Sequence, residues 1–283
     1  MKPILIILLS LGALNLPAQS IFADLYGGAA NYQGDLQTKR FDLNQSKLAI
    51  GLGGSYDLNA KFSIRGAANY INIAGSDDPG DAAKKVGYRN LQFKSTIWEA
   101  QLAMEYNVLD INERGFSPYV FAGLAVFHFN PYAFDTLGNK VFLRPLGTEG
   151  QDLPQYPEKK IYSNNQLAIP FGLGIKLALT DKLQIGLEMG LRKLLTDFLD
   201  DVSGTYADSS ILAAAKGAQA VAFAYRGTEI HGAATYPTAG SIRGNPKNND
   251  WYYITALRVR YSIATKGSNN SKKGKLGCPA NIY

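Results

Sequence analysis

The side chains best suited to acid–base or metal chemistry in this chain are two histidines, His128 and His231, and a single cysteine, Cys278. A zinc site needs several such ligands at close spacing, and these three lie far apart in the sequence. A hydrolase or acyltransferase would need His128 within hydrogen-bond reach of a nucleophile. Instead, His128 stands between Phe127 and Phe129, with no serine two residues further on. We therefore expect His128 to serve packing or hydrogen bonding, with catalysis as the alternative.

Four aspartates gather in one polar stretch near the middle of the chain. They are Asp197, Asp200, Asp201 and Asp208. A calcium loop of the EF-hand type would place carboxylates at alternating positions around a central glycine, and this pattern is missing. We expect the aspartates to have a structural role at a strand end. No glycine-rich phosphate-binding pattern is present, so the sequence predicts no catalytic residues, no cofactor site and no metal site.

The strongest structural signal is the alternation of apolar and polar residues, which is typical of a sheet with two different faces. In residues 97–108, Trp98 and Leu102 fall on one face, while Glu99 and Glu105 fall on the other. Seven further segments read as strands, which makes eight in all. They are 50–58, 62–70, 169–179, 183–192 and 257–263, together with 21–32 and 118–129, which are more uniformly apolar or glycine-rich.

The connections between these segments alternate between short and long. The short ones are 59–60, 110–116 and 180–182, and the long polar ones are 33–46, 76–95, 130–165 and 196–250. Outer-membrane barrels have short periplasmic turns and long outward loops, whereas a soluble sandwich has no reason to sort its loops in this way. We therefore predict an all-β fold, an eight-stranded antiparallel transmembrane β-barrel in the cell outer membrane.

Aromatic residues near the short turns fit this prediction. A barrel of this kind carries interfacial aromatic girdles, and an even number of strands returns both ends of the barrel to the periplasmic side. The residues expected in the periplasmic girdle are Tyr56, Phe62, Tyr106, Tyr119 and Tyr261.

One long loop also contains a helical signal. Asp208 is well placed to cap a short helix over about residues 210–224, which includes an alanine-rich run. Gly217 interrupts this segment and weakens the expected helix.

The polar face of the strands carries charges of both signs. An eight-stranded barrel is only wide enough for side chains to fill, and a lone buried charge is costly, so these charges should pair across the interior. We expect a plugged lumen rather than a porin, with an ion or proton path as the alternative. The predicted lumen charge network comprises Arg65, Glu99, Glu105, Lys176, Glu188, Arg258 and Arg260. Arg192 and Asp57 fall on the same face.

The two ends of the chain are expected to lie outside the barrel. Residues 1–20 read as a secretory signal peptide, because a lysine precedes an apolar run that is too short for a spanning helix. Residues 21–265 then form the barrel, and residues 266–283 form a periplasmic tail. The tail carries Cys278 and four of the lysines behind the formal net charge of +6, which argues against a nucleic-acid-binding face. An unpaired cysteine in an oxidising compartment makes Cys278 a candidate for an intermolecular disulfide.

A series of short strings, in order along the chain, resembles the PorG family of outer-membrane barrels of the type IX secretion system in Bacteroidota. These strings are Asn31 to Leu36, Arg89 to Ser95, Tyr119 to Gly123, Phe127 to Pro131, Pro145 to Gln151, Ile169 to Gly174, Thr196 to Ser203, Arg243 to Pro246, Asn249 to Tyr252, and Cys278-Pro279.

The resemblance implies a non-enzymatic part of a secretion machine. Proteins of this family associate on the periplasmic side with the ring built from the lipoprotein PorK and its partner PorN. Through that ring they support export of cargo with a C-terminal sorting domain. Two alternatives remain open from the residues: a lipid A-modifying barrel enzyme that uses His128, and an OmpA-like structural or adhesive barrel. Cys278 is then a candidate for a disulfide with the ring lipoprotein.

Overall fold

The computed structural model describes residues 20–37, 45–77, 89–230 and 235–264. The predicted signal peptide, apart from Ser20, lies outside the described residues. The predicted tail, with Cys278, and His231 lie outside them as well.

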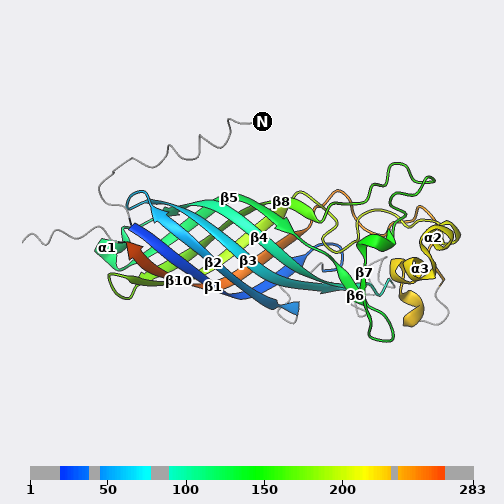
Figure 1. Ribbon diagram of the computed structural model, residues 1–283, viewed down its shortest axis with the longest axis horizontal. Coiled ribbons are helices and arrows are strands. Elements are labelled where there is room, and N and C mark those ends of the chain that lie inside the picture. The colour runs from blue at the N-terminus through cyan, green and yellow to red at the C-terminus, as the bar shows by residue number, and fades with distance from the viewer. Residues whose placement is uncertain (1–19, 38–44, 78–88, 231–234, 265–283) are drawn as a thin grey trace, which may run out of the picture.

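Eight long strands form a closed antiparallel barrel, which confirms the predicted fold class (Figure 1). Each strand pairs with its neighbour along the barrel wall, and the barrel closes through the pairing of β3 with β4. Closure leaves no unpaired sheet edge. An unpaired edge in lipid would be unfavourable, because its backbone groups would have no hydrogen-bond partners. The strands are β1 (Ser20–Gln33), β2 (Lys47–Asp57), β3 (Phe62–Ser76), β4 (Gln92–Asn107), β5 (Phe116–His128), β8 (Asn165–Ala178), β9 (Leu183–Leu194) and β10 (Trp251–Ala264).

The apolar residues of each alternating segment face outward from the barrel wall, and the polar residues face the lumen. On β4, Leu102 is 63% exposed on the outer surface, while its neighbour Ala103 and the inward Glu105 are buried. Leu124 on β5 is 71% exposed in the same outward position. An apolar exterior of this kind suits a lipid environment, since alternating side chains face lipid and lumen in turn.

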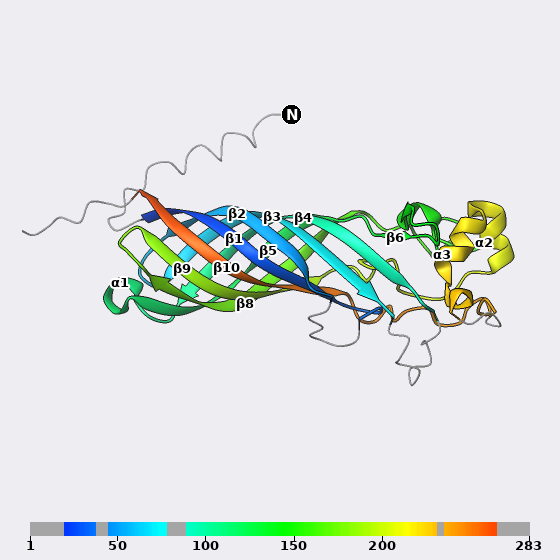
Figure 2. The ribbon, with the colours of Figure 1, turned by 90° about the horizontal axis from the view of Figure 1, so that it is seen from below.

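The connections are sorted between the two ends of the barrel, as predicted (Figure 2). Short turns join the strands at one end, where β1 begins and β10 ends. One of these turns contains α1 (Ile111–Arg114), which Asp110 caps at its start and Gly115 ends in the left-handed conformation. The long connections extend from the opposite end and carry the remaining helices (Figures 1 and 2).

The periplasmic aromatic girdle forms from four of the five predicted residues. Phe62 and Tyr106 lie side by side on the outer surface with ring centroids 5.2 Å apart. Tyr261 is 53% exposed and Tyr56 is half-buried. The prediction for Tyr119 was wrong, because its side chain is 1% exposed and points into the lumen.

Inward-facing glycines explain the position of Tyr119. A Cβ atom at Gly174 would come within 2.5 Å of the Tyr119 ring, and one at Gly172 within 2.8 Å of Phe121. The space left by these glycines on β8 is filled by the two aromatic rings of β5. Single-strand alternation could not reveal this, since the relation holds between neighbouring strands.

The described parts of the long loops pack into a cap over the outer end of the barrel. One loop forms a hairpin of β6 (Tyr132–Phe134) and β7 (Lys140–Phe142), followed by η2 (Arg144–Leu146). The last loop carries α2 (Ser209–Lys216), α3 (Ala218–Ala224) and η3 (Gly227–Glu229). The hairpin was not predicted, because its two strands are only three residues each.

The helical prediction for the last loop is confirmed with a break in the middle. The Asp208 side chain accepts hydrogen bonds from the backbone of Ser210 and Ile211 at the start of α2. Gly217 has a φ of +89°, a conformation that L residues rarely adopt, and it separates α2 from α3.

Candidate functional site

The barrel interior is filled by a network of buried charges centred on Glu105. Lys176 Nζ lies 2.6 Å from one Glu105 oxygen, and Arg258 Nη1 lies 2.6 Å from the other. Arg65 Nη1 is 3.4 Å from that second oxygen. Three cations from β8, β10 and β3 therefore surround one carboxylate of β4. In an interior without bulk water each of these charges needs an oppositely charged neighbour, because burial of an unpaired charge has a large desolvation cost.

A second carboxylate, Glu188, completes this layer. Arg65 donates to both Glu188 oxygens, at 2.5 and 3.1 Å, and the Tyr119 hydroxyl donates to the same carboxylate at 2.9 Å. The Arg65 guanidinium also lies over the Phe121 ring, 3.7 Å from its centroid. A bidentate contact that also stacks on an aromatic ring is geometry that arginine provides and lysine cannot.

Two further layers lie toward the ends of the lumen. Toward the cap, Glu99 contacts Arg192 at 3.3 Å and accepts a hydrogen bond from Asn69 at 2.7 Å. Glu99 also accepts a short hydrogen bond from the Tyr252 hydroxyl. Toward the short turns, Arg260 lies 2.9 Å from Asp57 and 3.4 Å from Asp24.

All seven residues named for the lumen network lie inside the barrel, where they are buried. Asp24, which contacts Arg258 at 3.0 Å, was missed by sequence reasoning. Its segment is rich in apolar residues and glycine, but Asp24 alternates with the apolar Ile21 and Leu25, and this opposite parity is the signal that could have placed it inward. With Asp24, the ion pairs join five cations to five carboxylates. These are Arg65, Lys176, Arg192, Arg258 and Arg260 with Asp24, Asp57, Glu99, Glu105 and Glu188.

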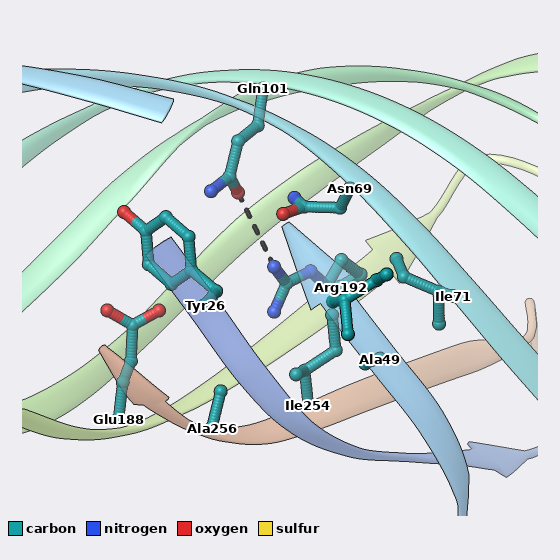
Figure 3. A pocket seen from close by; sticks show the side chains of 10 residues that line it. Tyr26, Ala49, Asn69, Ile71, Gln101, Glu188, Arg192, Ile254 and Ala256 are labelled. Carbon is teal, nitrogen blue, oxygen red and sulfur yellow. Dashed lines mark hydrogen bonds between the residues drawn. The ribbon is translucent and has the colours of Figure 1, made fainter. Parts of the chain in front are cut away.

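One small cavity lies among the side chains that fill the barrel. A cavity of about 20 Å³ lies between Tyr26, Gln101, Glu188 and Arg192, with Gln101 accepting a hydrogen bond from Arg192 at 3.4 Å (Figure 3). This volume accommodates about one water molecule. Tyr26 lines this cavity, and its buried hydroxyl has no hydrogen-bond partner among the residues that the structure describes. The cavity is far too small to form a continuous aqueous path.

The cap is held together by a second buried network centred on Arg243. Its Nη1 lies 2.9 Å from Glu149 and donates to the Asp201 carbonyl at 2.6 Å. Glu149 in turn accepts from the backbone of Ser203 at 2.9 Å. Burial alone would lower the pKa of Arg243, but the carboxylates of Glu149 and Asp201 raise it above its ordinary range. Arg243 therefore stays charged and joins two loops at the barrel mouth.

Arg89 connects this network to the two shorter loops. It contacts Asp77 at 2.6 Å, donates to the Asp35 carbonyl at 2.9 Å, and donates a short hydrogen bond to the Arg243 carbonyl. The Asp35 carboxylate accepts from the backbone of Asn245 at 2.9 Å. All four outward connections thus contribute to one hydrogen-bonded unit.

Two buried carboxylates face a single tyrosine at the base of the cap. The Tyr32 hydroxyl lies 2.5 Å from Asp200 and 3.2 Å from Asp250. One hydroxyl proton cannot fully satisfy both acceptors, and each carboxylate also accepts a backbone N–H, from Val202 and Leu199 respectively. Burial raises the pKa of Asp200 and of Asp250 well above the usual range, and repulsion between neighbouring carboxylates adds to the effect.

The other predicted aspartates have separate environments. Burial raises the pKa of Asp197 to about 7. Burial also raises the pKa of Asp201 to about 6, although Arg243 opposes the rise. Asp201 accepts from Thr148 at 2.6 Å and from Tyr162 at 2.7 Å. In the part of the chain that the structure describes, no group of three or more His, Cys, Asp or Glu residues is arranged to hold a metal ion.

His128 lies at the outer end of β5, with its side chain exposed on the outer surface. Its Nδ1 is 2.8 Å from the Asn165 side-chain oxygen on β8. Within the described ranges, no serine or threonine hydroxyl is hydrogen-bonded to His128. The geometry is that of a hydrogen bond between neighbouring strands.

The closed barrel, its filled lumen and its loop cap define an outer-membrane β-barrel protein. Residues 4–213 match the outer membrane protein beta-barrel domain family, and the chain belongs to this family. This membership places the protein in the outer membrane. No helix among the described residues is both long enough and apolar enough to cross a membrane.

Several solved structures match this chain at low sequence identity. Neisserial surface protein A matches at 10% identity and a TM-score of 0.41, over 87% of this chain and 97% of that one. Ail of Yersinia pestis, in complex with a heparin analogue, matches at 8% identity and a TM-score of 0.41, over 88% and 100%. OprG of Pseudomonas aeruginosa matches at 12% identity and a TM-score of 0.41, over 86% and 97%. The comparison with curated proteins gave no match.

Proposed function

We propose that this protein is a structural outer-membrane component of the type IX secretion system, which docks the periplasmic ring of PorK and PorN to the membrane. The proposal rests on the resemblance to the PorG family. The filled lumen supports a docking role over a transport role, because a barrel closed by ion pairs offers no route for a protein.

The observation that carries the proposal is that several of the sequence segments that resemble the PorG family come together in the folded cap. Asp35, Arg89, Glu149, Asp201 and Arg243 come from five separate strings, yet they meet in one buried network. Residues joined in this way, through side chains and backbone carbonyls, form a single structural unit. The presence of all five residues in one chain is therefore stronger support for the family resemblance than any one of the short segments alone.

A deletion strain tests the docking role. We expect loss of the protein to reduce export of cargo with a C-terminal sorting domain, and wild-type protein to restore it. The purified protein should bring PorK and PorN with it in mild detergent. On a non-reducing gel, a heavier band that is absent from Cys278→Ser would place the contact at the tail. Normal export and normal ring assembly in the deletion strain would contradict the proposal.

A purely structural or adhesive barrel of the OmpA type is the second candidate. The outward-facing cap favours it, since such a surface is available to contact other molecules. The two candidates separate in the same deletion strain, where this alternative predicts normal export with a weakened envelope or reduced adhesion. Complementation with His128→Ala, followed by lipid A mass spectrometry, tests the enzyme alternative. Altered lipid A together with normal export would favour an enzyme.

A further inference from the structure

A group of lysines and aromatic residues lies on the outer surface where the barrel wall meets the cap. The hairpin of β6 and β7 continues the wall beyond the end of β5, alongside β4 (Figure 1). Tyr132 of β6 pairs directly with Lys94 of β4. The pairing of Tyr132 with Phe142 and of Phe134 with Lys140 places these four side chains on the same outward face as Lys94. We call these five residues the basic aromatic face.

The opposite side of the hairpin anchors it to the cap. Ala133 is 2% exposed within the main hydrophobic cluster, and Val141 packs against that cluster. The hairpin is therefore held against the protein on one side. Its other side is left facing outward, where Phe142 is 42% exposed and Leu137, at the hairpin turn, is 85% exposed.

The lysines of this face lie over aromatic rings. Lys140 Nζ lies 3.7 Å from the Tyr132 ring centroid and 4.8 Å from that of Phe142. Lys94 Nζ lies 5.0 Å from the Phe134 ring centroid. Among the described residues, no carboxylate lies within ion-pair distance of either ammonium group. The nearby Asp135 is turned into the hairpin, where it accepts from the backbone of Leu137 and Asn139.

The height of the face relative to the membrane follows from the strand register. Trp98 and Tyr70 pair across β4 and β3 with ring centroids 4.9 Å apart, and Trp98 is 60% exposed. Such a pair marks the outer edge of the apolar band of the barrel, above which the headgroups begin. Lys94 is four residues further along the tilted strand, which places it about 10 Å above this level. That is the depth of polar headgroups, and not of acyl chains.

The same combination occurs elsewhere on the outer rim. Lys193 on β9 lies 5.9 Å from the ring of Trp251, its pairing partner on β10. At the periplasmic end the exposed charges are instead mixed, with Glu113 beside Arg114 and Asp181 beside Lys182. The outer rim thus favours an anionic partner, whereas the periplasmic rim shows no such preference.

We propose that the basic aromatic face binds the phosphorylated sugar headgroup of a glycolipid in the outer leaflet. The ammonium groups of Lys94 and Lys140 pair with phosphate oxygens, and the faces of Tyr132 and Phe142 pack against the C–H groups of sugar rings. Charge complementarity and position at headgroup depth both select this partner. The inference rests on the barrel fold and its membrane position, and does not depend on the role in secretion.

Binding of lipid A to the intact purified protein tests this proposal. The protein is reconstituted in phosphatidylethanolamine nanodiscs and titrated with diphosphoryl lipid A or with chemically dephosphorylated lipid A, and bound lipid is counted by native mass spectrometry. We expect diphosphoryl lipid A to bind more tightly. Lys94→Gln and Lys140→Gln should each weaken its binding about 5-fold, and the double variant about 25-fold.

Lys182→Gln is the matched control, because it removes one exposed lysine from the periplasmic end. It should bind diphosphoryl lipid A as the wild type does. All three substituted lysines are exposed, and heat-modifiable migration on gels verifies that each of the four variants is folded. Equal binding of the two lipids by the wild type would overturn the proposal. So would an undiminished affinity of the folded double variant for diphosphoryl lipid A.

Discussion

Arg258 and Glu105 meet across the full width of the barrel, with Arg258 Nη1 2.6 Å from Glu105 Oε2. Their strands, β10 and β4, are separated by three strands on either side of the closed wall. The ion pair therefore spans the lumen and connects opposite walls. Side chains from the walls, and not a folded plug, close this barrel among the described residues.

Removing the central carboxylate should destabilise the barrel. Glu105→Gln keeps the shape of the side chain but leaves Lys176, Arg258 and Arg65 with one fewer negative charge. Loss of one partner from a buried ion pair costs about 3–5 kcal/mol. We expect that decrease in the free energy of unfolding in urea, in detergent micelles. Glu113→Gln, at an exposed position in α1, is the control and should change stability by less than about 0.5 kcal/mol. A similar result for the two variants would show that the network is not stabilising.

The filled lumen should not conduct ions. The cavity beside Tyr26 holds about one water molecule, and charged side chains occupy the layers above and below it. In planar lipid bilayers we expect no stable ohmic conductance from the purified protein. Steady open-channel steps that disappear in Glu99→Ala or Arg258→Ala would show that ions pass through the network, and would contradict this expectation.

Cysteine labelling on intact cells tests the orientation in the membrane. Leu137, at the tip of the outer hairpin, is 85% exposed, and Asn112 is exposed in the short turn that contains α1. In a Cys278→Ser background, a membrane-impermeant maleimide should label Leu137→Cys on whole cells. Asn112→Cys should react only after the outer membrane is permeabilised. The reverse labelling pattern would show that the barrel has the opposite orientation in the membrane.

Arg243 should be necessary for the cap but not for the barrel. Arg243→Ala removes the contacts to Glu149 and to the Asp201 carbonyl, and leaves Glu149 buried without its cation. We expect the cap to lose about 2–4 kcal/mol of local stability. Limited proteolysis should then cut the last long loop, while the barrel still migrates as a folded species in an unheated gel. Lys247→Ala, at an exposed position in the same loop, should leave cleavage unchanged.

The cap should become less stable as the pH rises. The pKa of Asp197 is about 7 in the folded protein and 3.8 ordinarily, so the folded state holds a proton that the unfolded loop releases. This contribution is fully present below an ordinary carboxyl pKa and is lost as the pH rises through about 7. The raised pKa values of Asp200 and Asp250 act in the same direction.

Hydrogen exchange of the cap amides measures this dependence. Protection at the Leu199 and Val202 amides should be greater at about pH 5 than at about pH 8, after correction for intrinsic exchange rates. Asp197→Asn should reduce the difference by increasing protection at the higher pH. Asp152→Asn, at an exposed position in the same cap, is the control. Protection that rises with pH in the wild type would contradict the assignment.

Alternation along the strands and the lengths of the loops were sufficient to predict the class of fold. Alternation in segments such as residues 97–108 predicted which side chains face inward, because a strand has a period of two regardless of its neighbours. The rhythm of loop lengths predicted which end of the barrel faces outward. Both patterns are local in the sequence, so they can be recognised without knowing which strands pair with each other.

Contacts between residues of different strands and loops follow from the three-dimensional arrangement of the chain. Tyr119 was predicted in the girdle but lies in the lumen, because glycines on the neighbouring strand leave room for its ring. The cap network joins Asp35 to Asn245 and Arg243 to Glu149, which are far apart in the chain. Such contacts depend on how the barrel's closure brings its four outward loops to one mouth. The pattern of residues within a single loop does not predict these contacts. They depend on how the four loops pack against one another at the barrel mouth.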